Sequence, residues 1–219
     1  MTVHLQREIN QLKKDILSLS ARVEETVQKA ARSIAHRDAD LAKEIMDEDI
    51  DIDESEVQVE EECLKILALH QPVAIDLRYI IAVLKINNDL ERIGDLAVNI
   101  AQSCIYLAEN EVVDIPFDFP HMARKAQEMV GRSLDALVNM DPDLARDVHA
   151  SDDEVDDINR QMYELVGRSI EQESQNVAAL LRLMTVSQNL ERIADHATNI
   201  AEDVVYMCEG SIVRHKEEV

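Results

Sequence analysis

A twelve-residue segment of this chain occurs twice, one hundred positions apart. Residues 90–101 read LERIGDLAVNIA, and residues 190–201 read LERIADHATNIA. Both copies keep the apolar positions and also the polar pattern Glu-xxx-Asp-xxx-Asn. Residues four positions apart lie on one face of a helix, so each copy predicts a helix that carries a row of polar side chains. Repetition of the apolar positions alone would repeat a fold, whereas repetition of the polar row indicates a site in each half.

The repeat extends well beyond this segment. Residues 31–34 match residues 131–134, and residues 38–43 match residues 141–146. Between the halves lies DIPFDFP, which contains two of the four prolines and shows no helical pattern. The sequence therefore predicts two tandem units, residues 1–112 and 121–219, joined by a linker at residues 113–120.

Each unit is expected to be a bundle of three long helices. The 219 residues include only 4 glycines and 4 prolines, a composition typical of helical proteins. Apolar residues alternate at spacings of three and four along six stretches, which is the pattern of a helix buried on one face. The six helices are predicted at residues 3–35, 38–69, 73–108, 121–139, 141–171 and 174–210. The fold class is therefore all-α, with two tandem three-helix bundles related by internal duplication.

Residues at the expected helix ends support these boundaries. Asp38 and Asp141 precede two of the predicted helices and are expected to cap them. Pro142 then occupies a first helical position, where its missing N–H is tolerated. Ser174 is a candidate cap for the last helix, and Gly210 is expected to end it.

Charge excludes several classes of partner. The formal net charge is −23, from 22 basic and 45 acidic side chains. Such a chain is not expected to bind nucleic acid, which requires basic residues that displace counterions, nor an anionic membrane surface. Cations and proteins with basic patches are the expected partners.

The sequence also predicts a cytoplasmic protein that is not inserted in a membrane. No apolar run is long enough to cross a bilayer, and the start MTVH lacks the features of a signal peptide. Three cysteines are scattered without a Cys-x-x-Cys pattern. Cys63 and Cys104 lie among apolar residues and are expected to be buried thiols, which fits a reducing compartment.

The duplicated polar row places two carboxylates one helical turn apart in each half. These are Glu91 and Asp95, and then Glu191 and Asp195. Like charges at this spacing destabilise a helix by roughly 0.2–0.5 kcal/mol. In a chain this acidic, one isolated pair could belong to an ordinary solvated face. Its repetition favours a functional site.

The middle helix of each unit carries a second set of acidic residues. An apolar row begins at Ile45 and recurs every seven residues, but Asp49 and Glu56 occupy intervening positions where a bundle normally has apolar residues. Asp152 and Asn159 take the equivalent places in the second unit. Asp53 and Asp156 then follow Asp49 and Asp152 by four residues. Each unit therefore combines an Asp-xxx-Asp row with a Glu-xxx-Asp row.

Antiparallel packing would bring these rows together, and converging carboxylates repel one another unless a cation lies between them. Oxygen ligands suit Mg²⁺, Ca²⁺ or Mn²⁺, and iron or zinc can also be held. The Glu-x-x-His pairs of di-iron bundles are missing from the sequence, as are a glycine-rich phosphate loop and a nucleophile motif. His196 has Leu96 as its counterpart and is expected at the surface rather than in the duplicated site, although an extra ligand in one half is an alternative.

These motifs identify a resemblance. Residues 71–78 (QPVAIDLR), 90–95 (LERIGD) and 190–202 (LERIADHATNIAE) resemble those of the PhoU family of phosphate-signalling accessory proteins, and the resemblance spans essentially the whole chain. It implies two similar three-helix bundles. It also implies metal ions (iron, zinc, manganese or magnesium) held by Glu91, Asp95, Glu191 and Asp195. The assignment of Asp49, Asp53, Asp152 and Asp156 as further ligands comes from the interrupted apolar rows.

The resemblance also implies a regulatory role. Family members are thought to link the ATPase subunit of the phosphate ABC transporter to a phosphate-sensing histidine kinase. They restrain phosphate uptake and the phosphate-starvation response. A non-enzymatic adaptor, acting as a homodimer, is therefore expected. The alternatives are a metal-dependent hydrolase or oxidase at the carboxylate clusters, and a metal store.

Overall fold

The protein was analysed as a computed structural model, which describes residues 3–110, 117–172 and 176–210. The first half contains α1 (Val3–His36), α2 (Ala39–His70) and α3 (Ala74–Glu109). The second half contains α4 (Phe119–Asn139), α5 (Pro142–His149), α6 (Asp152–Gln172) and α7 (Val177–Glu209). The all-α prediction with internally duplicated bundles is confirmed. Phe119 and Pro120, the last residues of the expected linker, begin α4.

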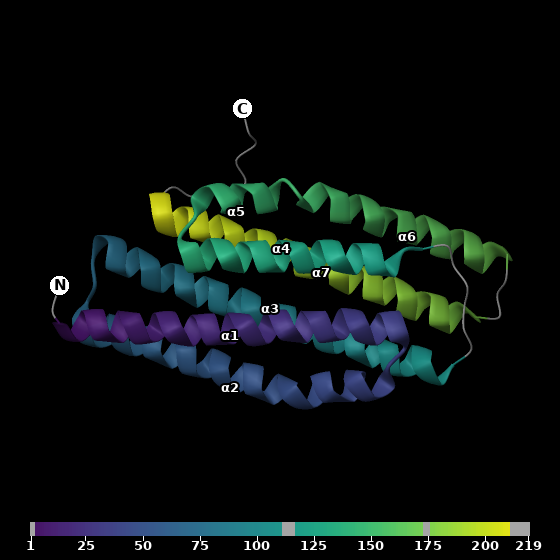
Figure 1. Cartoon of the computed structure of the whole chain (residues 1–219), viewed down its shortest axis with the longest axis horizontal. Helices are drawn as coiled ribbons and strands as arrows, with labels where there is room; N and C mark the ends of the chain where they lie inside the picture. Colours follow the sequence, from purple (N-terminus) through teal and green to yellow (C-terminus); the bar gives the residue numbers. More distant parts are fainter. Residues whose placement is uncertain (1–2, 111–116, 173–175, 211–219) are drawn as a thin grey trace.

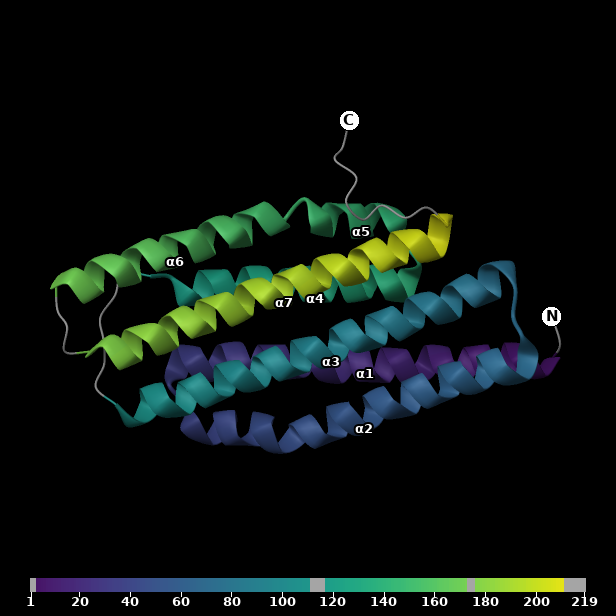
Figure 2. The same cartoon turned by 180° about the vertical axis from the view of Figure 1, so that it is seen from behind.

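The two bundles lie side by side and meet along their last helices. Figures 1 and 2 show α1, α2 and α3 in one bundle and α4 to α7 in the other, with α3 next to α7. One cluster of buried apolar residues extends through both halves, from Leu12 and Ile93 in the first to Met122 and Ile193 in the second. The duplicated polar rows therefore lie on the two central helices.

The predicted caps of the middle helices are confirmed in both halves. Asp38 accepts hydrogen bonds from the N–H groups of Asp40 and Leu41, and Asp141 accepts them from the second and third residues after it. Gly210 ends α7 at a φ of 75°, a conformation that glycine adopts without steric cost. Ser174 lies outside the described residues.

The helix predicted at residues 141–171 is interrupted. α5 ends at His149, and α6 begins at Asp152. The Ser151 hydroxyl donates to the Asp147 carbonyl (3.1 Å), while the Ser151 N–H bonds to the Val148 carbonyl (3.0 Å) in a tighter turn. A serine side chain that competes for a backbone carbonyl favours such a break. As a result, Asp152 lies in the first turn of α6, where the helix dipole favours negative charge.

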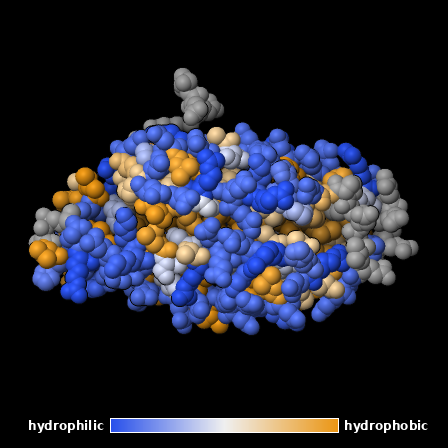
Figure 3. Space-filling model, viewed as in Figure 1, coloured by the Kyte–Doolittle hydropathy of each residue, from blue (hydrophilic) through white to orange (hydrophobic). Residues whose placement is uncertain are grey.

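The surface is largely hydrophilic. Figure 3 shows mostly polar residues on the face that carries α1 and α4, with apolar residues gathered along the seam between these two helices. No helix in the described part of the chain is long and apolar enough to span a membrane. Cys63 and Cys104 are buried free thiols, as predicted.

Candidate metal centres

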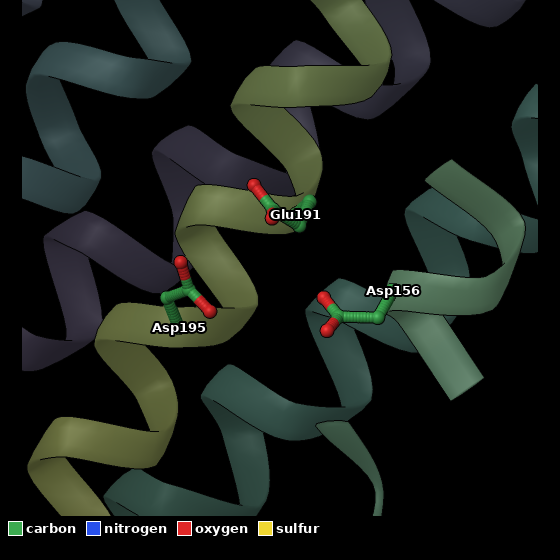
Figure 4. A group of neighbouring side chains, drawn as sticks. All are labelled: Asp156, Glu191 and Asp195. Carbon is green, nitrogen blue, oxygen red and sulfur yellow. The ribbon is translucent and has the colours of Figure 1, made fainter. Parts of the chain in front are cut away.

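The second half brings three carboxylates together between α6 and α7. Glu191 and Asp195 lie one turn apart on α7, and Asp156 projects from α6 toward them (Figure 4). One carboxylate oxygen from each of the three residues lies within 4.8 Å of the others. All three belong to the set that the sequence predicted. We call them the second-half cluster.

Asp152 extends this cluster by one turn of α6. Its Oδ1 atom is buried and has no hydrogen-bond partner. Burial, followed by the charges of Asp195 and Asp156, raises the pKa of Asp152 to about 6. The charge of His149 opposes this shift, but Asp152 makes no ion pair among the described residues. Such a carboxylate is unfavourable unless it is protonated or binds a cation.

Glu191 is the most strongly affected carboxyl of the cluster. Burial, together with the charges of Asp195, Asp156 and Asp152, raises its pKa to about 7. The pKa of Asp195 is raised by partial burial and by Asp156. Arg192 opposes both shifts, but it makes no ion pair with either carboxylate among the described residues. The cluster therefore carries excess negative charge at its centre.

The first half places its four predicted residues in the corresponding positions between α2 and α3. Burial, followed by Asp53 and Asp95, raises the pKa of Asp49. Burial and then Asp95 raise the pKa of Glu91. Gly94 allows the helices to approach here, since a Cβ atom on it would lie 3.3 Å from Ile52 and 3.9 Å from the Asp49 Oδ1 atom.

The two halves differ in how this negative charge is balanced. In the first half, the Arg92 guanidinium lies 3.4 Å from both Glu91 and Asp95. The Oε2 atom of Glu91 is buried and accepts no hydrogen bond. Within the described residues, the group of three ligands inside 4.8 Å occurs in the second half only. The first site is thus looser and partly neutralised.

Comparison with known protein families shows that the two halves match the same domain. The PhoU domain family matches residues 16–104 and again residues 119–204. These two matches cover the same helices that carry the two carboxylate sites. The chain belongs to the PhoU family.

Relatives along the full length agree with this assignment. The phosphate-specific transport system accessory protein PhoU homolog of Pseudomonas aeruginosa is 36% identical over 231 residues, covering 100% of this chain and 95% of the relative. PhoU homolog 1 of Thermotoga maritima is 33% identical over 209 residues, covering 95% of this chain and 90% of the relative.

Solved PhoU structures share the fold. The crystal structure of PhoU from Pseudomonas aeruginosa has a TM-score of 0.90 at 33% identity, over 94% of this chain and 99% of that one. The phosphate transport system regulatory protein PhoU from Streptococcus pneumoniae has a TM-score of 0.83 at 27% identity, over 95% and 99% of the two chains.

The donor set of this PhoU-family chain fits hard cations. All eight predicted positions offer carboxylate oxygens, which Mg²⁺ and Mn²⁺ prefer and which iron also accepts. Buried carboxylate oxygens without hydrogen-bond partners occur at Glu91 and Asp152, one in each half. Burial and, after it, repulsion raise the pKa values of these two groups, and a cation at either position would offset both effects.

Two further polar positions of the middle helices have a different role. The Asn87 side chain donates to the Glu56 carboxylate (3.0 Å), and the Ser187 hydroxyl donates to Asn159 (2.7 Å). Glu56 and Asn159 are the other residues that interrupt the apolar rows, and Asn87 and Ser187 precede Glu91 and Glu191 by one turn. Sequence reasoning did not find these hydrogen-bonded pairs, although the four-residue spacing from the Glu-xxx-Asp rows was a usable signal.

The expectation that His196 is a surface residue is wrong. Its Nδ1 atom lies 2.8 Å from the Asp89 carboxylate on α3, and both side chains are mostly buried. Asn199 donates to the same oxygen at 3.4 Å. The packing of α7 against α3 turns His196 toward the other half, so that it joins the two bundles instead of facing solvent.

Proposed function

We propose that this protein is a metal-binding, non-enzymatic regulator of phosphate uptake and of the phosphate-starvation response. The observation that carries the metal-binding part is the second-half cluster, in which Asp156, Glu191 and Asp195 converge and make no ion pair with one basic residue in common among the described residues. Support for the regulatory part comes from the relatives, which are named as accessory or regulatory proteins of phosphate transport.

A bound metal ion would hold neighbouring helices of each bundle together. A divalent or trivalent ion at the second-half cluster would be held by Asp156 of α6 together with Glu191 and Asp195 of α7, with Asp152 as a further donor. In the first half, Asp49 and Asp53 of α2 would act with Glu91 and Asp95 of α3. Iron, zinc, manganese and magnesium are the proposed ions. Each would offset the mutual repulsion of the carboxylates and so stabilise the pairing of the two helices.

The regulatory step would be contact with other proteins. The proposed partners are the ATPase subunit of the phosphate ABC transporter and a phosphate-sensing histidine kinase, both reached from the cytoplasm. The net charge of −23 would steer the protein toward basic surfaces. Association as a homodimer is part of the proposal.

A genetic experiment tests this function directly. In a strain that lacks the gene and has no paralogue, a phosphate-starvation reporter should stay active in high phosphate, and the native gene should repress it. A gene that encodes Glu191→Gln with Asp195→Asn should repress less well, while Asp135→Asn, an exposed residue outside both sites, should repress normally. Full repression in the deletion strain would defeat the regulatory proposal.

The enzymatic alternative is tested on purified protein. Metal-loaded protein should neither hydrolyse phosphate esters nor consume oxygen above the rate of the Glu191→Gln/Asp195→Asn variant. Turnover that depends on these two residues would contradict the non-enzymatic proposal and support a metal-dependent hydrolase or oxidase.

A further inference from the structure

One face of α2 exposes apolar side chains that the core does not use. Ile50, Val57 and Leu64 recur every seven residues and are 63%, 49% and 53% exposed. The buried row of the same helix starts at Ile45 and faces α1 and α3. We call the three exposed residues the α2 row. It extends over about 21 Å at 1.5 Å per residue.

The second half shows that the bundle does not require this row. At the duplicated register, where Asp49 corresponds to Asp152, the α2 row corresponds to Asp153, Arg160 and Gly167 on α6. All three are exposed. The same helix of the same fold therefore accepts polar residues and glycine at these positions, while its buried row stays apolar. Apolar residues in the first half need an explanation other than packing within the bundle.

The charged residues beside the α2 row determine which kind of partner can bind over it. Helical neighbours lie three or four residues apart, and the neighbours of the row on both sides are largely acidic. These are Asp47, Glu54 and Glu61 on one side, and Asp53 and Glu60 on the other. Three other acidic residues of α2, Glu44, Glu48 and Asp51, pair with basic residues of α1. Within the described residues, the five neighbours form no ion pair.

We propose that the α2 row is a docking surface for a basic amphipathic helix of another protein. Such a helix would lay its apolar side on Ile50, Val57 and Leu64 and place lysines or arginines beside Asp47, Glu54, Glu60 and Glu61, which are not among the proposed metal ligands. About four turns would cover the row. A second copy of this chain brings the same carboxylates and a charge of −23, and an anionic membrane is repelled in the same way. The inference rests on the proposed function in one respect, namely that the protein acts through contact with other proteins.

The test uses the full-length protein and a synthetic peptide. The probe is a lysine-rich helical peptide of about 18 residues with leucine at heptad spacing, and the comparison is a scrambled peptide of identical composition. The heptad peptide should bind at least about tenfold more tightly than the scrambled one. Equal affinity for both would reduce the interaction to net charge and overturn the proposal.

The matched variant is Ile50→Asp/Val57→Arg, which introduces the residue types found at Asp153 and Arg160. It leaves the net charge unchanged and alters only exposed side chains. It should bind the heptad peptide at least about tenfold more weakly, with the native helix content and melting temperature. The control is Ile75→Asp/Leu181→Arg, which changes two other exposed apolar residues and should bind as the native protein does. Native affinity in the α2 variant would overturn the proposal.

Two further outcomes separate competing explanations. If sedimentation shows a native dimer that Ile50→Asp/Val57→Arg converts to a monomer, a second copy covers the row and the proposal is wrong. Metal binding to the second-half cluster should not change in this variant. Native peptide affinity in this variant, with intact metal binding and intact reporter repression, would overturn the docking surface without affecting the proposed function.

Discussion

At the scale of single residues, the raised pKa values of two second-half carboxyls predict how the metal-free protein responds to pH. The pKa of Glu191 rises from 4.5 to about 7, and that of Asp152 rises from 3.8 to about 6. A raised carboxyl pKa means that the folded state binds more protons than the unfolded state between the two values. Stability is therefore lost as pH rises through this window.

The melting temperature of metal-free protein should fall between about pH 4 and pH 7, because Glu191 and Asp152 keep their protons to higher pH in the folded than in the unfolded state. Glu191→Gln, which carries no titrating proton, should melt higher than the native protein at the upper end and vary less with pH. Thermal unfolding followed by circular dichroism in chelator measures this. A native melting temperature that rises over the same range would contradict the assignment of these groups.

Asp49 tests the first-half site. This half-buried carboxylate lies near Gly94, where a Cβ atom would be 3.9 Å from its Oδ1 atom, in a position that the heptad pattern reserves for an apolar residue. Asp49→Leu should stabilise the metal-free protein, by about 1 kcal/mol, because it removes a partly desolvated charge. It should also reduce the stabilisation gained from Mn²⁺. Denaturant unfolding with and without Mn²⁺ separates these effects, and an unchanged Mn²⁺ effect would remove Asp49 from the ligand set.

The sequence predicted these residues because helical spacing is local. A row four residues apart must share a face, so the Glu-xxx-Asp and Asp-xxx-Asp rows could be placed without knowledge of the fold. The Arg92 ion pairs are local in the same way, since Arg92 lies one and three residues from Glu91 and Asp95. The Asp89–His196 contact could not be predicted, because it depends on how one helix is rotated against another. Spacing within one helix does not give that rotation.

At the scale of helices, the caps explain why the duplicated boundaries agree so well with the sequence. Asp38 and Asp141 each accept two backbone N–H groups at the start of α2 and α5. Asp38→Ala and Asp141→Ala should each cost about 1 kcal/mol of unfolding free energy. Asp40→Ala, which removes only an exposed pair with Lys43, should change stability by less than about 0.5 kcal/mol. Urea unfolding decides this, and equal losses at Asp38 and Asp40 would refute the capping role.

Helix ends were predictable where a residue with a strong local preference marks them. The break between α5 and α6 was not, because neither Ala150 nor Ser151 excludes a helix by itself. At the break, the Ser151 hydroxyl donates to the Asp147 carbonyl, but the same bond from Ser55 to the Asp51 carbonyl lies inside the unbroken α2. The matching stretch of α2 contains Asp47 and Glu48 and continues without interruption.

At the scale of the whole molecule, the packing of α3 against α7 departs from the internal symmetry. Asp89 meets His196 and Asn199, whereas the symmetry-related positions are Asn189 and Leu96. His196→Leu should destabilise the protein by about 1–3 kcal/mol because Asp89 loses its closest partner. Asp89→Asn in the same chain should recover part of that loss. A double-mutant cycle from urea unfolding gives the coupling, and a coupling near zero would mean that this pair does not hold the halves together.

The contact between the halves was the largest feature that the sequence did not predict. The repeat implied two similar bundles, but their relative placement depends on which faces of two helices remain apolar after each bundle has formed. The contact face of α3 and α7 includes buried polar residues such as Asp89 and Asp203. Their sequence positions alone do not show that they are buried.

The most direct test of the account is metal binding at the second-half cluster. Chelator-treated native protein and the Glu191→Gln/Asp195→Asn variant are titrated with Mn²⁺ in a calorimeter, with bound metal measured after dialysis. The account predicts that the native protein binds Mn²⁺ and that the variant loses its tightest site while keeping the weaker first-half binding. It also predicts that native affinity declines as pH falls below about 7, because protons compete for Glu191. Equal Mn²⁺ content and affinity in both proteins would contradict the account.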